Sequence, residues 1–305
     1  MASGRVIGVD LGGTKLLAGT VDAGLNVHHR AHRFARGSDT AQVLDTIVDA
    51  VREARDATDE EIDAVGFGIP SLIDQERGVA VTTVHLPIRD LPFRDLMAER
   101  LGLPVFVDND ATAAMLAEWR FGAAMDCSDA ILLTIGTGIG GGMVANSALV
   151  RGAQGAAAEF GHMTIDIDGP LCPCGAHGCL EAFVSGTALA REARALGLDL
   201  TAAQVAELAH DGHTGARGLV VEMGTRLGAG IANLVNAFNP QMVVVGGGVL
   251  ALGDMLLAPA REEVARRALP PSRDLVRIVP TRFGAESGML GAAVMALDGL
   301  ATSAK

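Results

Sequence analysis

Positive charge is scarce in this sequence. Its 305 residues include 24 lysines and arginines against 36 aspartates and glutamates, which gives a formal net charge of −12. An acidic surface repels nucleic acids and anionic membranes, so we expect neither as a main partner. The sequence also lacks a run of about 18 apolar residues, which predicts that no helix spans a membrane. The N-terminus lacks the basic and apolar regions of a signal peptide, so we expect a cytoplasmic protein.

Cysteine is also scarce, but it is clustered. Three of the four cysteines lie in the segment LCPCGAHGCLE, at Cys172, Cys174 and Cys179. Cytosolic thiols stay reduced, three thiols are an odd number for disulfides, and the spacing is not that of a C-x-x-C redox pair. Three thiolates with one histidine can bind a structural zinc ion, and both His162 and His177 are candidates for the fourth ligand.

The order of apolar and amphipathic segments predicts an α/β fold. The length suggests two domains, and short apolar runs alternate with helical patterns such as that of residues 41–57. Residues 5–20 and 130–145 both have the pattern strand, glycine turn, strand, so they look like two copies of one hairpin. We therefore expect a small N-terminal α/β domain at 1–118, completed by a C-terminal helix at about 289–305. A larger α/β domain at 119–288 would carry the cysteines.

Three glycine turns follow apolar strands, at Gly12–Gly13, Gly136–Gly142 and Gly246–Gly248. A glycine turn presents backbone N–H groups that donate hydrogen bonds to phosphate oxygens, so three such turns predict a nucleotide site. GTGIGG also fits the G-x-G-x-x-G pattern of dinucleotide folds. That interpretation needs a helix directly after the turn, whereas the residues that follow indicate a strand.

Six motifs, in the same order along the chain, resemble those of the ROK family (repressor, open reading frame, kinase), and most of all its glucokinases of the actinobacterial type. They are DLGGTK at 10–15, DND at 108–110, GTGIGGG at 136–142, EFGH at 159–162, CPCGAHGCLE at 172–181 and VVGGGV at 244–249. The resemblance implies an actin/hexokinase-like (ribonuclease H-like) fold of two domains that close on ATP and a sugar. It implies ATP-dependent phosphorylation of a hexose at its primary hydroxyl, in glycolysis, with glucose as the expected hexose. It further implies ATP, Mg²⁺ and structural Zn²⁺ as cofactors, and a homo-oligomer, either a dimer or a tetramer.

The resemblance also implies roles for individual residues. Asp110 would be the general base for the sugar hydroxyl, although spacing alone also allows a helix-capping aspartate. Asp10 would help to hold Mg²⁺, and Thr14 would contact the transferred phosphate. The sugar-binding set would be Ser71, Asn109, Glu159, His162 and Glu181. The nucleotide-binding set would be Asp10, Gly12, Gly13, Thr14, Lys15, Thr137, Gly138, Gly246, Gly247 and Gly248. The zinc ligands would be His162, Cys172, Cys174 and Cys179, and a site with four protein ligands would not activate a substrate.

Several alternatives stay open at this point. Ser71, His85 and Ile88 depart from the family's pattern on the sugar side, so fructose, mannose or an N-acetylhexosamine could replace glucose. The phosphate donor could be polyphosphate. A non-catalytic, sugar-sensing regulator of the same family would carry an N-terminal helix-turn-helix, and the sequence begins at the first glycine hairpin, which favours a kinase. Because the glycine turns lie away from the cysteines in sequence, we expect loss of zinc to weaken sugar binding and to spare ATP binding.

Overall fold

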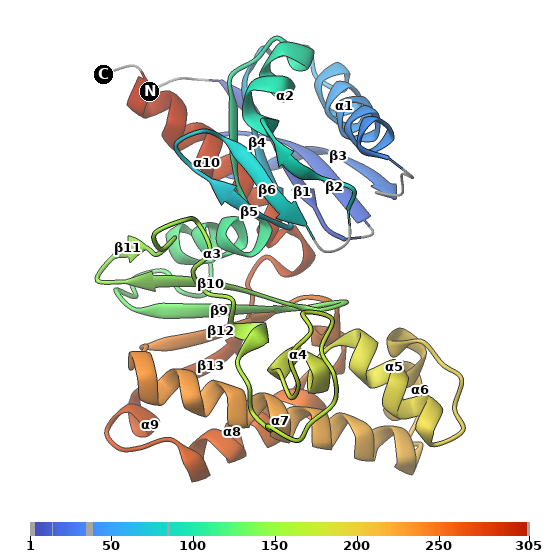
Figure 1. Cartoon of the computed structure of the whole chain (residues 1–305). Helices are drawn as coiled ribbons and strands as arrows, with labels where there is room; N and C mark the ends of the chain where they lie inside the picture. Colours follow the sequence, from blue (N-terminus) through green and yellow to red (C-terminus); the bar gives the residue numbers. More distant parts are fainter. Residues whose placement is uncertain (1–3, 14, 35–38, 84–85, 304–305) are drawn as a thin grey trace. The chain divides into compact units, whose positions relative to one another are not determined.

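The structure is a computed structural model that describes residues 4–13, 15–34, 39–83 and 86–303 (Figure 1). It divides into two compact units. Unit 1 comprises Met1–Met125, Leu149–Ala157 and Glu286–Lys305, and unit 2 comprises Asp126–Ala148 and Ala158–Ala285. The N-terminal and C-terminal segments thus share one unit. Residues 149–157 form the linking segment, which packs with unit 1 although the sequence predicts it within the second domain.

Unit 1 contains a five-stranded sheet with the strand order β3-β2-β1-β4-β8. Strands β1 and β2 form an antiparallel hairpin, and β4 lies parallel to both β1 and β8. The bounds of these strands are β1 Arg5–Leu11, β2 Lys15–Val21, β3 Val27–Phe34, β4 Ile62–Ile69 and β8 Val105–Asn109. A smaller antiparallel sheet consists of β5 Ser71–Asp74, β6 Val79–Thr83 and β7 Arg89–Leu91.

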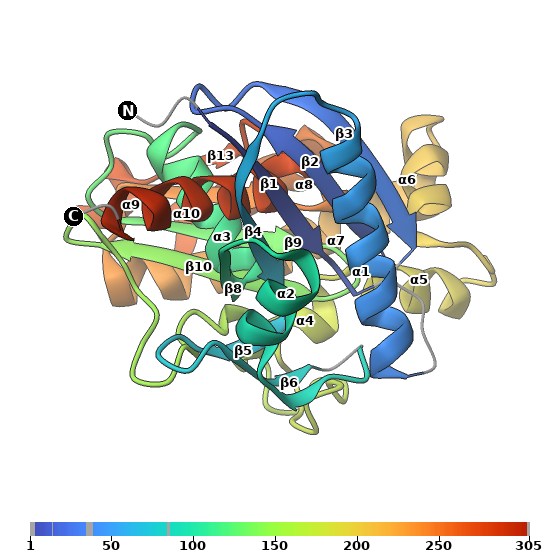
Figure 2. The same cartoon turned by 90° about the horizontal axis from the view of Figure 1, so that it is seen from above.

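Four helices of the described chain pack on this sheet, namely α1, α2, α3 and α10, and the positions of their apolar residues determine which helix face is buried. Helix α1 (Thr40–Asp56) contacts β2 and β3 (Figure 2), and Val43, Ile47 and Val51 are buried on it, as the apolar periodicity predicts. It shares one apolar core with helix α2 (Phe93–Leu101).

Helix α10 (Ser287–Ser303) contacts β1, β4 and helix α3 (Asp110–Arg120). Gly8 and Gly66 permit this contact, because a Cβ atom on them would lie 2.1 Å and 1.8 Å from backbone oxygens of α10. Glycine on the strands therefore brings the start of α10 close to the end of β1.

Unit 2 repeats the strand order of unit 1, as β11-β10-β9-β12-β13. Strands β9 and β10 form the antiparallel hairpin, and β12 is parallel to β9 and β13. The bounds are β9 Ala130–Ile135, β10 Ile139–Ala145, β11 Ala148–Leu149, β12 Met242–Gly246 and β13 Arg277–Pro280. The predicted second copy of the glycine hairpin is confirmed. The dinucleotide interpretation of GTGIGG is wrong, because strand β10 and not a helix follows the turn.

The helices of unit 2 gather against one face of its sheet (Figure 1), and α4 to α8 share a single apolar core with the sheet. Helices α7 and α8 pack against each other in this layer. The α-helices are α4 Leu180–Phe183, α5 Gly186–Ala195, α6 Ala202–His210, α7 Thr214–Phe238, α8 Asp254–Arg267 and α9 Ser272–Leu275. The short 3₁₀ helices are η1 Phe160–His162, η2 Gly248–Leu252 and η3 Gly284–Glu286. No helix in the described part of the chain is long and apolar enough to cross a membrane.

Candidate active site and metal centre

The candidate catalytic residues of unit 1 lie at one edge of its sheet. Strands β1, β4 and β8 are parallel, and Asp10 pairs with Gly68, which in turn pairs with Asp108. Asp110 follows β8 as the first residue of α3. The carboxyl ends of parallel strands, with a helix N-terminus beside them, are where ligands bind in open α/β sheets. The sheet edge that carries Asp10 and Asp110 is thus where unit 1 is expected to bind its ligands and to hold its catalytic groups.

Asp10 lies in an environment that disfavours its negative charge. Burial, and secondly the charge of Asp110, raise the pKa of Asp10 to about 8. A Cβ atom on Gly288 would lie 2.5 Å from the Asp10 carboxyl carbon, so the start of α10 closes over this side chain. Two acidic side chains held together in this way fit a divalent cation, which would offset their repulsion, and Mg²⁺ prefers such oxygen ligands. Thr14, the predicted phosphate contact, lies outside the described residues.

The structure distinguishes the helix cap from the candidate base. The Oδ1 atom of Asn109 accepts hydrogen bonds from the backbone N–H groups of Ala111 and Thr112, at 3.0 and 3.1 Å. Asn109 is therefore the N-cap of α3, while Asp110 lies in the first turn and its Oδ1 atom accepts a 2.9 Å hydrogen bond from Ala111 N. The Asn109 amide Nδ2 lies 3.4 Å from the carbonyl oxygen of Ser71.

Two of the positions that depart from the family's pattern have no side chain available to a sugar. Ser71 is buried, and its hydroxyl lies 2.8 Å from the Thr82 carbonyl and 3.0 Å from that of Leu72. Ile88 is part of the apolar core of unit 1, so a change there alters packing and not a sugar contact. His85 lies outside the described residues. The loop between β1 and β2 is closed by a 2.8 Å hydrogen bond from Gly12 N to Lys15 O.

The glycine turn of unit 2 between β9 and β10 is held by contacts that the sequence does not predict. Gly186 N donates to Gly136 O at 2.7 Å, and the Thr187 hydroxyl donates to Thr137 O at 2.8 Å. Both donors belong to the first turn of α5, whose N-cap is Ser185. A serine cap followed by Gly-Thr is visible in the sequence, but nothing in the sequence shows that it faces this turn.

The third glycine turn lies beside the second one. Gly247 adopts a φ of +88°, which favours glycine, and a Cβ atom on it would lie 2.2 Å from the Ile135 carbonyl oxygen at the end of β9. A Cβ atom on Gly248 would point into open space, with only atoms of the adjoining backbone within 4 Å. The two glycine turns of unit 2 therefore form one surface with exposed backbone, as a phosphate site requires.

The three clustered cysteines converge on His162. The ligand atoms of His162, Cys172, Cys174 and Cys179 all lie within 4.8 Å of one another. Cys174 Sγ is 3.6 Å from Cys179 Sγ, and Cys172 Sγ is 3.7 Å from His162 Nδ1. Zinc bond lengths of about 2.3 Å to sulfur and 2.0 Å to nitrogen place tetrahedral ligands roughly 3.5–3.8 Å apart, so the four residues fit zinc. His177 instead lies with its Nδ1 atom 3.0 Å from Gly169 O.

Local backbone chemistry shapes this site. Gly175 and Gly178 adopt φ angles of +93° and +70°, and a Cβ atom on Gly178 would lie 1.5 Å from the Asp166 carbonyl oxygen. Burial raises the pKa of the Cys172 thiol to about 12, so without a cation this thiol stays protonated. A bound metal ion reverses that preference, because a coordinating thiol is deprotonated.

Glu181 joins the cysteine site to the glycine turn. Its Oε2 atom accepts a 2.7 Å hydrogen bond from Ile139 N, the first residue after that turn, while Cys172 Sγ lies 3.7 Å from Oε1. Gly138 makes room for this carboxylate, because a Cβ atom there would lie 2.3 Å from Oε2. The sequence separates these two features, and the fold brings them into contact.

His162 presents its second nitrogen to another candidate sugar ligand. With Nδ1 facing Cys172, the Nε2 atom lies 3.9 Å from Glu159 Oε2. Burial raises the pKa of Glu159, and the charge of Glu181 adds to that rise. Glu159, His162 and Glu181 thus belong to one polar cluster, which adjoins the metal ligands.

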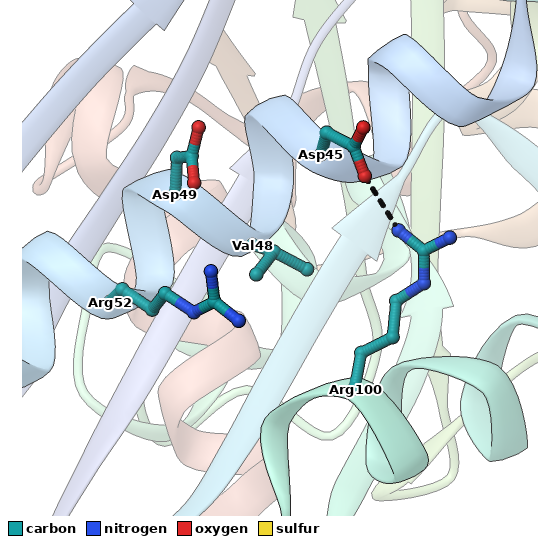
Figure 3. Close-up of a pocket in the computed structure, with 5 residues that line it drawn as sticks. All are labelled: Asp45, Val48, Asp49, Arg52 and Arg100. Carbon is teal, nitrogen blue, oxygen red and sulfur yellow. Dashed lines mark hydrogen bonds and ion pairs between the residues drawn. The ribbon is translucent and has the colours of Figure 1, made fainter.

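A hollow elsewhere on unit 1 has a different character. It has a volume of about 390 Å³ and is lined by Asp45, Val48, Asp49, Arg52 and Arg100 of α1 and α2 (Figure 3). Its residues include an ion pair of 2.9 Å between Arg100 and Asp45. None of the predicted site residues that the structure describes lines this hollow.

Residues 6–299 match the model of the ROK family. This chain belongs to the ROK family. A glucokinase of Streptomyces coelicolor is 35% identical to it over 97% of this chain and 98% of that protein. A solved ROK family glucokinase from Streptomyces griseus, in complex with glucose and AMPPNP, superimposes with a TM-score of 0.89. It is 35% identical and covers 97% of this chain and 100% of its own. The fold is therefore the actin/hexokinase-like fold of ROK glucokinases. A putative xylose repressor of Caldicellulosiruptor is also similar, with 32% identity over 97% of this chain and 78% of that protein.

Proposed function

We propose that this ROK-family protein is a sugar kinase that transfers the γ-phosphoryl group of ATP to the primary hydroxyl of glucose. The observation that carries the proposal is the placement of Asp110 beside Asp10 at the carboxyl edge of the unit 1 sheet, while Asn109 and not Asp110 is the N-cap of α3. The similarity to glucokinases over nearly the full chain supports it.

Asp110 accepts the proton of the sugar hydroxyl in this mechanism. A carboxylate of ordinary basicity is sufficient, because the hydroxyl becomes acidic only as the phosphoryl group is transferred. Asn109 orients the sugar through its amide, while its carbonyl oxygen stays on the helix N-terminus. The carboxylates of Glu159 and Glu181 accept hydrogen bonds from other sugar hydroxyls, and the Nε2–H group of His162 donates one to a hydroxyl oxygen. A sugar that lacks one of these hydroxyls leaves a polar group unpaired.

The glycine turns bind the nucleotide. Thr137, Gly138 and Gly246–Gly248 offer backbone N–H groups in unit 2. Gly13 and Lys15 do so at the β1–β2 loop of unit 1, which the hydrogen bond from Gly12 N to Lys15 O closes. Mg²⁺, when bound, neutralises charge on the phosphates. Asp10 is the residue that holds this ion or its water, and the pKa of about 8 in the protein without metal fits a side chain that needs a cation nearby.

His162, Cys172, Cys174 and Cys179 hold a structural zinc ion. Four protein ligands leave no open coordination position, so the zinc supplies a cross-link and no Lewis acid for the substrate. The cross-link fixes the ring of His162 and the start of α4, and these carry the polar groups proposed to bind sugar.

The similarity to a xylose repressor means that family membership alone does not decide between catalysis and regulation. A repressor needs to bind a sugar, but it does not need a base or a cation site for phosphate. The paired carboxylates therefore favour the kinase. Ser71 and Ile88 have buried side chains, which also removes two of the reasons to doubt glucose.

The decisive experiment measures ADP release with ATP and Mg²⁺ over a panel of glucose, fructose, mannose, N-acetylglucosamine and N-acetylmannosamine, with polyphosphate as a second donor. Asp110→Asn should lower kcat with glucose by at least about 100-fold and leave glucose binding nearly unchanged, since the amide keeps the shape but accepts no proton. Asp39→Asn is the matched control, because Asp39 caps α1 and asparagine caps equally well. An Asp110→Asn protein of near-native kcat would refute the role of the base.

The glycolytic role, the cytoplasmic location and the assembly into a dimer or tetramer stay predictions from the sequence. Light scattering on the purified protein tests the assembly.

A further inference from the structure

Asp108 is a buried carboxylate that the proposed mechanism does not use, and it directly precedes the candidate site residues Asn109 and Asp110 in the sequence. Asp108 is 4% exposed and precedes Asn109 at the end of β8. Its Oδ2 atom accepts a hydrogen bond from Arg151 Nε at 2.7 Å, and its Oδ1 atom accepts from Gln75 Nε2 at 2.7 Å and from the backbone N of Asn109 at 2.9 Å. Burial raises the pKa of Asp108, and the charge of Arg151 opposes that rise.

The partner of this carboxylate comes from the linking segment. Arg151 O accepts a 3.1 Å hydrogen bond from Ala157 N, which closes the segment into a loop. Gly155 lies tightly against β5, because a Cβ atom on it would lie 2.0 Å from Ile73 O. Residues after the loop continue into Glu159 and η1. The ion pair of Arg151 with Asp108 therefore connects two parts of the chain. One is the linking segment, which leads to Glu159 of the sugar-binding cluster, and the other is strand β8, which ends at Asn109.

A second set of contacts ties the same strand end to β5. Gln75, which binds Asp108, directly follows β5, and Asn109 Nδ2 lies 3.4 Å from the carbonyl of Ser71 at its start. Three segments distant in sequence thus converge on the carboxylate of Asp108: the residue after β5, the end of β8 and the linking segment. Only one of the donors, Arg151, is charged.

We propose that Arg151 is a positioning residue for phosphoryl transfer, whose ion pair with Asp108 sets the orientation of Asn109 and Asp110. The inference rests on the proposed kinase function. Without the guanidinium group, Asp108 keeps only neutral donors in a buried place, where an unpaired charge is unfavourable. The carboxylate then turns toward water. Its hydrogen bond to the backbone of Asn109 shifts with it, and the two residues that follow move.

Loss of Arg151 should lower the efficiency with glucose and should leave the binding of ATP unchanged. The contacts described for the Arg151 and Asp108 side chains lie within unit 1, whereas the glycine turns of unit 2 are held by Glu181, Gly186 and Thr187. Misplacement of a reacting group by about 1 Å can cost on the order of 100-fold in rate. We therefore expect Arg151→Ala to lower kcat/KM for glucose by about 10- to 100-fold, while KM for ATP stays within about twofold.

Arg100→Ala is the matched control. Arg100 and Arg151 have similar exposed fractions, 33% and 37%, and similar ion-pair distances, 2.9 and 2.7 Å. Their partners differ, because the Asp45 side chain is 69% exposed and that of Asp108 is 5% exposed. An exposed ion pair contributes little, so the control should keep native kcat and both native KM values. An equal loss in the control would show a general effect of removing arginine and would overturn the inference.

Chemical rescue separates positioning from general stability. Because Arg151 is partly exposed, guanidinium ion at non-denaturing concentrations should reach the space left in Arg151→Ala and restore part of kcat/KM for glucose, with no effect on the wild type or on Arg100→Ala. Arg151→Gln, which keeps one hydrogen-bond donor without charge, serves if the alanine variant does not fold, and it should show an intermediate loss.

The outcomes can be told apart from those of the proposed function. A wild-type protein that phosphorylates no sugar of the panel would refute the kinase and this inference with it. An active wild type with native-like kcat/KM for glucose in both Arg151 variants, a parallel rise of both KM values, or an absence of guanidinium rescue would overturn this inference alone.

Discussion

Replacing Cys174 by serine is the sharpest test of the metal site. Cys174 is the exposed member of the cluster, whereas Cys172 and Cys179 are buried. Serine has nearly the shape of cysteine, so at an exposed position the change leaves almost no cavity. Without a metal, such a surface substitution should change the free energy of unfolding by no more than about 0.5 kcal/mol.

With zinc bound, the same change removes one of four ligands. Zinc contributes about 10–16 kcal/mol in zinc-finger peptides, and we expect loss of a ligand to cost at least about 3 kcal/mol of it here. For domains of 150–250 residues each kcal/mol shifts Tm by about 2–4 °C, so Tm should fall by roughly 6–12 °C. A site with zinc and a site without metal thus predict losses of unfolding free energy that differ severalfold, and calorimetry can measure this difference.

The structure also changes what the loss of zinc should do to nucleotide binding. Glu181 lies two residues after Cys179 and holds Ile139 N at the glycine turn, and α4 leads into the first turn of α5, which holds Gly136 and Thr137. A hydrogen bond to a charged group contributes about 1.5–3 kcal/mol, so AMPPNP affinity should fall by about tenfold or more, together with glucose affinity. The expectation from the sequence, that ATP binding is spared, is replaced by this one.

The assay combines elemental analysis, calorimetric unfolding and titrations with AMPPNP and glucose. Cys127→Ser is the control, since Cys127 is a buried cysteine of unit 2 outside the metal cluster. It should keep one zinc ion per chain and native AMPPNP affinity. Absence of zinc from the wild type, or a Cys174→Ser protein with native Tm and native affinities, would refute the reasoning.

Two further predictions concern the glycine turn and Asp10. Gly138→Ala should displace the Glu181 carboxylate from Ile139 N and weaken both AMPPNP and glucose binding; titration calorimetry would contradict this if only AMPPNP binding changed. Asp10→Asn should abolish turnover but stabilise the metal-free protein at alkaline pH. Because the folded pKa of Asp10 is raised to about 8, its contribution to stability is fully present below a pH of about 4 and is lost as the pH rises through 8. The Tm difference between Asp10→Asn and the wild type, measured without Mg²⁺, should therefore grow between pH 5 and 9 by an amount equivalent to a few kcal/mol; a difference independent of pH would contradict it.

The parts of the fold that the sequence predicts well depend on local backbone chemistry. A glycine turn after an apolar strand gives a hairpin wherever it occurs, so both hairpins and their repetition can be recognised from residues 5–20 and 130–145. The stripe of Val43, Ile47 and Val51 likewise predicts α1, because apolar residues that recur about every 3.6 positions lie on one face of an α-helix. The domain boundary is harder, since the linking segment joins unit 1 through contacts with residues far from it in sequence.

The candidate site divides in the same way. The sequence by itself determined the types of groups available: three thiols with a histidine nearby, glycine turns with bare backbone, and carboxylates after two strands. Their chemistry follows from composition and spacing. The resemblance to the ROK family favoured His162 over His177, and the tertiary structure brings His162 to the thiols. Only the tertiary structure decided that Asn109 is the N-cap of α3 and that Ile88 is buried in a core. It alone placed Glu181 on the glycine turn and Arg151 on Asp108. These contacts join residues about 40 positions apart, and no local propensity encodes them, because they depend on how strands and helices pack once the chain has folded.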